Sequence, residues 1–167
     1  LLEGAQLRTY NLSEAKMFCA NAHPTDDSVL LAATAHAMLD DSDDFAMYYQ
    51  LYAGVFTDCK FGPSFSHWLT TGKPSDSSYT NGPAARAGVL GYLDNEDEVL
   101  SLAKRSAEAT HSHQEAIDGA QAVAWTTWAM RKRISPQEIC EELYQQWNYY
   151  VDQTHSHNLA KMRSEAV

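Results

Sequence analysis

The chain is short of cysteine, of positive charge and of long apolar runs, and each shortage excludes a class of protein. Cys19, Cys59 and Cys140 form no CxxC pair, so we predict free thiols in a reducing, cytoplasmic compartment rather than a disulfide framework. Twelve basic residues against 22 acidic ones give a net charge of -10, which disfavours duplex nucleic acid as a partner. No apolar run is long enough to cross a bilayer, so we expect no membrane partner.

Common catalytic motifs are also absent. The sequence contains no GxSxG nucleophile turn, no HExxH zinc motif, no GxxxxGK[ST] phosphate loop and no GxGxxG dinucleotide motif. His113 and Glu115 have the HxE spacing of zinc deaminases, but no PCxxC segment follows to complete that metal site. Any enzymatic chemistry must therefore come from another arrangement of residues.

Helical periodicity and capping signals dominate what is present. From the length of 167 residues and the 44% of hydrophobic residues, we predict that residues 1–167 form one all-α domain. We predict a first helix from about residue 25, others over about 43–56, 64–69, 96–109 and 114–132, and two more that begin beyond Gly82 and at Ser135.

Particular residues are expected to cap or anchor these helices. Ser42 and Asn95 are predicted N-caps, and Ser135 with Glu138 forms a predicted capping box. The first helix is apolar around most of its surface, and helix 114–132 carries small residues, so we expect both to be central. In the last helix, four residues are expected to face inward: Ile139, Leu143, Trp147 and Tyr150.

The segment HPTDDS, residues 23–28, places two carboxylates and two hydroxyls at the start of the first helix. Acidic residues here complement the helix dipole, which is sufficient reason for them to be present. The same oxygen atoms are also hard ligands that suit a divalent cation. Taken alone, the segment leaves the structural and the functional interpretation open.

Two further segments contain groups that could contact a ligand. Residues 77–86, SSYTNGPAAR, place an Asn-Gly turn before helix-forming residues, which can aim backbone amides at a phosphate or simply start a helix. His111 and His113 lie between two predicted helices, where they could contact a ligand, cap a helix or face solvent. An acidic protein can hold an anion when backbone amides or divalent cations supply the local positive charge.

Taken in this order, the segments resemble the ADP-ribosylglycohydrolase family. The resemblance is carried by Glu3 shortly before HPTDDS, by SSYTNGPAARAGVLGYL over 77–93 and by SLAKRSAEATHSHQEAIDGAQAVA over 101–124. It implies a compact orthogonal helical bundle of the family type that holds two magnesium ions above a cleft for ADP-ribose. It also implies magnesium-dependent hydrolysis of the glycosidic bond that links ADP-ribose to a protein side chain or a small acceptor.

The resemblance assigns roles to residues that match the family's motifs. Thr25, Asp26 and Asp27 would be metal ligands, and Asp26, Asp27 and Glu3 would take part in catalysis, with Glu3 near the distal ribose. The loop residues that would wrap the diphosphate are Ser78, Tyr79, Asn81 and Gly82, and His111 would lie in the ligand cleft. A metal pair can orient ribose hydroxyls while a carboxylate activates water at the anomeric carbon.

Three features depart from the family pattern. Thr80 stands where the family usually has glycine, no Gly-Asp segment precedes Glu3, and no Asp-x-Asp-Thr/Ser motif follows Val151. We therefore expect either that segments outside these residues supply the remaining metal ligands or that the chain is a catalytically incomplete ADP-ribose-binding or interaction domain. A helical domain that binds no adenine nucleotide is the third hypothesis.

Overall fold

Helices make up almost all the regular structure of the computed structural model, which describes residues 23–150. The predicted all-α class is confirmed. Within that range the elements are α1 (Asp26–Leu39), α2 (Phe45–Val55), α3 (Pro63–Thr71), α4 (Gly82–Ala87), the 3-10 helix η1 (Gly88–Tyr92), α5 (Glu96–Glu108), α6 (Gln114–Arg131) and α7 (Pro136–Trp147). Glu3 and Cys19 lie outside the described residues, and the extent of the domain over 1–167 stays a prediction.

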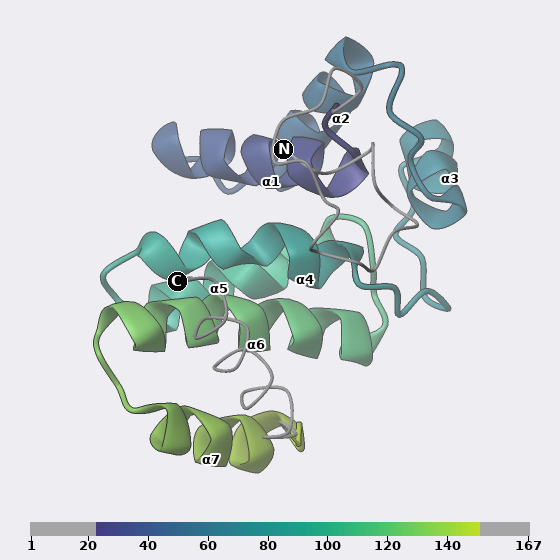
Figure 1. Cartoon of the computed structure of the whole chain (residues 1–167). Coiled ribbons are helices and arrows are strands. Elements are labelled where there is room, and N and C mark those ends of the chain that lie inside the picture. The colour runs from purple at the N-terminus through teal and green to yellow at the C-terminus, as the bar shows by residue number, and fades with distance from the viewer. Residues whose placement is uncertain (1–22, 151–167) are drawn as a thin grey trace, which may run out of the picture.

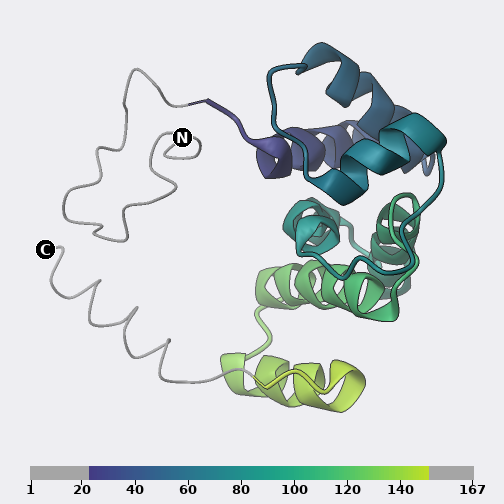
Figure 2. The ribbon, with the colours of Figure 1, turned by 90° about the vertical axis from the view of Figure 1, so that its right-hand side faces the viewer.

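The helices form three tiers around α6 (Figures 1 and 2). Helices α1, α2 and α3 form one tier, α4, η1, α5 and α6 form the next, and α7 lies on the far side of α6. Helix α6 packs against α4, η1, α5 and α7, and its Ala120 and Ala124 are fully buried. Small side chains let neighbouring backbones approach closely, and the predicted central position of this helix is confirmed.

The backbones of η1 and α6 approach each other closely at Gly91. A Cβ atom added to Gly91 would be 2.5 Å from the Cβ of Thr127 and 2.6 Å from the carbonyl oxygen of Ala124. Glycine is therefore required at position 91 by the packing itself, since no side chain fits between the two backbones.

Local capping signals fix several helix starts. Asn95 accepts a hydrogen bond from the Glu98 amide at 3.0 Å, and Ser135 forms the predicted capping box with Glu138. The prediction of Ser42 as the cap of the second helix is wrong. Asp44 is the N-cap of α2 and accepts from the backbone N–H of Met47 at 3.1 Å. Ser42 instead accepts from the Asp44 amide at 3.3 Å, which fixes the turn one step earlier.

Two predictions of burial are also wrong. Helix α1 is buried on one side only, because it packs against α2, α4 and η1, and Leu39 on its other side is 79% exposed. In the last helix Ile139 and Leu143 are buried as predicted, but Tyr150 is 84% exposed. The reason is that α7 ends at Asn148, whose left-handed φ of 55° turns the chain away from the helical stripe.

The described residues also bear on two predictions from composition. Within residues 23–150, Cys59 and Cys140 form no disulfide with each other. None of the helices in this range is both long and apolar enough to traverse a lipid bilayer.

Candidate active site

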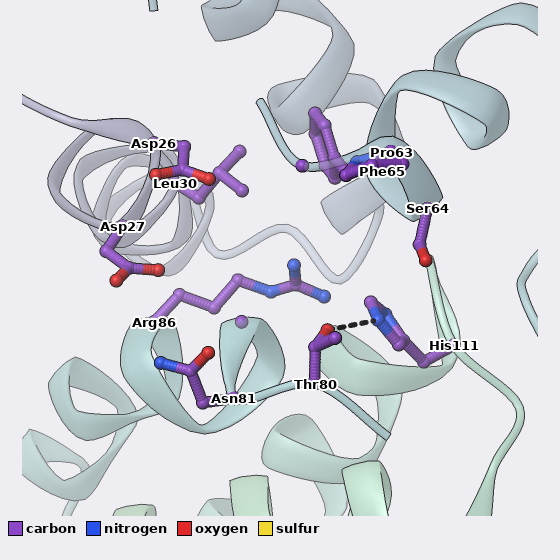
Figure 3. A pocket seen from close by; sticks show the side chains of 12 residues that line it. Asp26, Asp27, Leu30, Pro63, Ser64, Phe65, Thr80, Asn81, Arg86 and His111 are labelled. Atoms are coloured by element: carbon purple, nitrogen blue, oxygen red, sulfur yellow. Dashed lines mark hydrogen bonds between the residues drawn. The ribbon is translucent and has the colours of Figure 1, made fainter. Parts of the chain in front are cut away.

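A cavity of about 300 Å³ lies where the first tier meets the second. Its walls come from the N-terminus of α1, the start of α3, the loop before α4, and His111 (Figure 3). The polar residues around it are Asp26, Asp27, Ser64, Thr80, Asn81, Arg86 and His111. Segments that are far apart in the sequence therefore place carboxylates, an amide, an imidazole and a guanidinium around one space.

Asp26 and Asp27 form one wall of the cavity from the first turn of α1. Figure 3 shows both carboxylates on one side, with Arg86 between them and the side of the cavity that carries Thr80 and His111. Carboxylates at a helix N-terminus are stabilised by the helix dipole. The same position also leaves both within reach of a ligand in the cavity, so the structural and functional interpretations are compatible.

Arg86 is the largest polar side chain buried at the cavity, with 1% of its surface exposed. Its Nη2 donates to the carbonyl oxygen of Ser106 at 2.7 Å and to Oγ1 of Thr110 at 2.6 Å. The guanidinium also lies 4.3 Å from the ring centre of Tyr49, a favourable cation–π contact. Burial lowers the pKa of this guanidinium, which still carries its charge at neutral pH because an arginine starts so high.

One donor of Arg86 remains unused. Among residues 23–150, its buried Nε has no hydrogen-bond partner. Sequence analysis did not single out Arg86. The available signal was a lone charged residue in the otherwise apolar run of residues 82–93, a pattern that favours burial of the charge.

His111 is 3% exposed and lies between two threonine hydroxyls. Its Nδ1 is 2.8 Å from Oγ1 of Thr110, and its Nε2 is 3.3 Å from Oγ1 of Thr80. Burial, together with the nearby charge of Arg86, lowers the pKa of His111 to about 4. The ring is therefore neutral at pH 7 and contributes hydrogen bonds to the cavity rather than charge.

The backbone around His111 is held by the loop before α4. The amide of Ser75 donates to the carbonyl of Thr110 at 3.0 Å, and the amide of Ser112 donates to the carbonyl of Ser75 at 2.9 Å. These two bonds form a short bridge between the loop and the α5–α6 connection. The histidine and the loop therefore keep a fixed spacing across the cavity.

A second cavity, of about 550 Å³, adjoins the first. Thr80 and Asn81 line both cavities. Tyr79 lines only the second, where its ring centre lies 5.4 Å from that of His113. The rest of this wall includes Tyr149, whose phenol pKa is raised by burial and then by Glu115 and Asp118. The loop around Thr80 is thus the partition between an acidic cavity and an aromatic one.

The structure brings together most of the residues singled out from the sequence. Asp26, Asp27, Asn81, Gly82 and His111 line the first cavity. Three other residues do not line it: Tyr79 lines the second cavity, Ser78 is buried with its Oγ 3.3 Å from the Thr80 hydroxyl, and Thr25 is the N-cap of α1. Glu3 falls outside the described residues, and the individual roles stay predictions.

The oxygen atoms at the first cavity are of the kind that magnesium prefers as ligands. Asp26 and Asp27 supply carboxylate oxygens, and Thr25 supplies a hydroxyl next to them in sequence. Magnesium in proteins commonly binds one or two carboxylates and keeps several waters. Over residues 23–150, no cluster of three or more His, Cys, Asp and Glu side chains could hold a metal ion. Among the described residues, the ligands of a magnesium ion would therefore be Thr25, Asp26 and Asp27.

Comparison with known proteins gives one match. The family model described as ADP-ribosylglycohydrolase matches residues 3–166, which is almost the whole chain. The curated proteins contain no match to the chain. No solved structure matches it either.

Proposed function

The chain belongs to the ADP-ribosylglycohydrolase family, and on that premise we propose that its paired cavities bind ADP-ribose and that it hydrolyses the glycosidic bond joining ADP-ribose to a protein side chain or small acceptor. The supporting observation is that Asp26 and Asp27 line the same cavity as Asn81 and His111. Family membership indicates glycohydrolase-type activity, and the arrangement of these residues supports the first cavity as its site.

The shape of the site supports a ligand with two ends. The first cavity, of about 300 Å³, has the carboxylates, and the second, of about 550 Å³, has the rings of Tyr79 and Tyr149. Thr80 and Asn81 belong to both. ADP-ribose has a reactive ribose at one end, an aromatic base at the other and a diphosphate between them. We assign the ribose to the first cavity and the base to the second, with the diphosphate across the shared loop.

The charges around the first cavity suit this placement. Arg86 contributes a buried positive charge whose Nε has no partner among the described residues, and a buried charge acts strongly because little solvent screens it. His111 is neutral, so it can hydrogen-bond an oxygen without repelling Arg86. Together they offer hydrogen-bond donors to ribose hydroxyls, opposite the carboxylates of Asp26 and Asp27.

In the reaction, water attacks the anomeric carbon, the bond to the acceptor breaks with its electron pair on the acceptor atom, and that atom receives the proton that the water gives up. We propose that Asp26 or Asp27 accepts the proton of the attacking water while the other orients the ribose hydroxyls. Bound magnesium, held by Thr25, Asp26 and Asp27, would supply Lewis-acid polarisation of ribose and water oxygens. His111 and Asn81 would fix the ligand against the opposite wall.

An assay of ADP-ribose release from arginine-linked, serine-linked and O-acetyl ADP-ribose substrates tests the proposal. Asp26→Asn is expected to reduce turnover by about 100-fold or more, because it removes a charge that acts on the transition state. The matched control is Asp41→Asn, since Asp41 is exposed and has a φ of 52° that asparagine also tolerates. Unchanged turnover in Asp26→Asn would contradict the proposal.

A binding-only result is also informative. If the wild-type chain binds ADP-ribose but releases none from any substrate in the presence of magnesium, the hydrolase proposal fails. The protein is then the ADP-ribose-binding domain that forms the alternative hypothesis.

A further inference from the structure

The hydroxyl of Thr110 lies between the buried guanidinium of Arg86 and the ring of His111. We propose that Arg86 and Thr110 hold His111 in the neutral tautomer with its proton on Nε2, so that the cavity contains a fixed N–H donor for a ligand oxygen. In this arrangement Arg86 and Thr110 are positioning residues, since they act through His111. The use of the donor for a hydroxyl or phosphate oxygen rests on the proposed function.

The direction of the first hydrogen bond is fixed by chemistry. A guanidinium has donors and no acceptor, so Nη2 of Arg86 must donate to Oγ1 of Thr110 across 2.6 Å. Arg86 cannot swing away easily, because the same Nη2 donates to the Ser106 carbonyl at 2.7 Å and the guanidinium lies 4.3 Å from the centre of the Tyr49 ring. Thr110 is therefore an acceptor on this side.

The Thr110 hydroxyl can also donate one hydrogen bond of its own. Two further partners are described for Oγ1, Nδ1 of His111 at 2.8 Å and the carbonyl oxygen of Ala107 at 3.5 Å. A hydrogen bond of 2.8 Å is of ordinary length, whereas 3.5 Å is beyond the usual range. The hydrogen therefore goes to Nδ1, which becomes an acceptor.

The opposite tautomer would leave this network poorly satisfied. A proton on Nδ1 would have to be donated to a Thr110 oxygen that already accepts from Arg86. The threonine hydrogen would then have only the distant Ala107 carbonyl among these partners. Because Arg86, Thr110 and His111 are each at most 3% exposed, solvent compensates little for a weak hydrogen bond, and an unsatisfied buried group is costly.

The consequence appears on the cavity side of the ring. With Nδ1 accepting, neutral His111 carries its hydrogen on Nε2. Nε2 lies 3.3 Å from the hydroxyl of Thr80, the contact drawn as a dashed line in Figure 3. This contact is longer than an ordinary hydrogen bond. The Nε2–H group can therefore donate to a ligand oxygen in place of the Thr80 hydroxyl with little loss of free energy.

The tautomer can be measured without any ligand. Long-range proton–nitrogen correlation spectra of the full 167-residue chain, labelled with nitrogen-15 in histidine, distinguish the two neutral forms and the imidazolium. The His111 signals are identified by their loss in His111→Gln. We expect the Nε2-protonated pattern at pH 7, and an Nδ1-protonated or imidazolium pattern would overturn the proposal.

Two variants of Thr110 separate positioning from packing. Thr110→Ser retains the hydroxyl and is expected to keep the wild-type tautomer. Thr110→Val removes the hydroxyl with little change of shape, so the spectrum is expected to gain the Nδ1-protonated form. Its ADP-ribose affinity is expected to fall several-fold. If folded Thr110→Val shows the wild-type tautomer unchanged, the proposed role of Thr110 is wrong.

The outcomes also distinguish this inference from the proposed function. If the Nε2-protonated form is found and ADP-ribose fails to bind, the proposed function is contradicted and the positioning of His111 is retained. If ADP-ribose binds and His111 of the wild-type chain carries its proton on Nδ1, the positioning of His111 is contradicted and the proposed function is retained. Should Thr110→Val fail to fold by circular dichroism, the wild-type spectrum still decides the tautomer.

Discussion

Thr80 lies in the loop that lines both cavities, and its hydroxyl is 3.3 Å from Nε2 of His111. In the free protein the Thr80 hydroxyl oxygen accepts a hydrogen bond from the Nε2–H group of His111. We assign this same donor to a ligand oxygen in the complex. Thr80→Val removes the competing oxygen while keeping the branched shape of the side chain. We expect calorimetry to show ADP-ribose binding about two- to fivefold tighter, which corresponds to one weak neutral hydrogen bond.

Thr80→Ser is the matched control for this prediction. It keeps the oxygen at the same atom position, so its affinity for ADP-ribose should remain within about twofold of wild type. Weaker binding in Thr80→Val with unchanged binding in Thr80→Ser would show instead that the hydroxyl contacts the ligand.

The burial of His111 predicts a loss of stability in mild acid. Burial and then Arg86 hold its folded-state pKa at about 4, below the value of 6.5 expected for the unfolded chain. The unfolded chain therefore binds more protons between these values. The contribution of His111 to stability is complete above about pH 6.5 and declines as the pH falls towards 4, by up to about 3 kcal/mol.

Urea unfolding at a series of pH values measures this effect. His111→Gln retains a donor at the ε position but does not titrate, so its free energy of unfolding should lack this component of the decline between pH 6.5 and 4. Parallel curves for wild type and His111→Gln would show that His111 is not held neutral by the fold.

Arg86 is predicted to stabilise the fold as well as the site. Arg86→Met fills similar space but leaves the Ser106 carbonyl and the Thr110 hydroxyl without their donor. We expect a loss of about 2–4 kcal/mol in the free energy of unfolding. The control is Arg105→Met, because Arg105 is half exposed and pairs with Asp43 at the surface, where an ion pair contributes about 1 kcal/mol or less. Equal losses in both variants would refute the role given to the buried network.

How far the sequence predicts this molecule depends on how far apart the interacting groups are. The capping box of Ser135 and Glu138 spans three residues, so the local pattern contains all the information. The sequence places the cap of α2 two residues early, because Ser42 and Asp44 are both good capping residues and only the turn geometry decides between them.

The sequence predicts several residues of the site but not the hydrogen bonds that join them. Asp26, Asn81 and His111 were expected near one ligand, mainly through the family resemblance, and they do line one cavity. The partners of Arg86 lie 20 and 24 residues away in the chain, and no periodicity or spacing marks such a contact. Thr80 was recognised as a departure from the family, but its contact with His111 required the three-dimensional structure.

Gly91 gives a prediction about packing alone. Gly91→Ala would force a Cβ to within 2.5 Å of Thr127 and separate η1 from α6. We expect thermal or urea unfolding to show a loss of about 2 kcal/mol or more, as for overpacked cores. Gly88→Ala is the control, since a Cβ there meets its nearest neighbours at an ordinary 3.8 Å and φ is -55°. A stable Gly91→Ala protein would contradict the close contact.

We propose that the paired cavities bind ADP-ribose with magnesium at Asp26 and Asp27. The most direct test of this proposal is calorimetric titration of ADP-ribose into the purified chain, once with magnesium and once after treatment with EDTA. We predict binding that requires magnesium and that is lost in Asp26→Asn but kept in Asp41→Asn. Binding that is equal in both buffers would contradict the metal site, and binding in neither would contradict the proposed function.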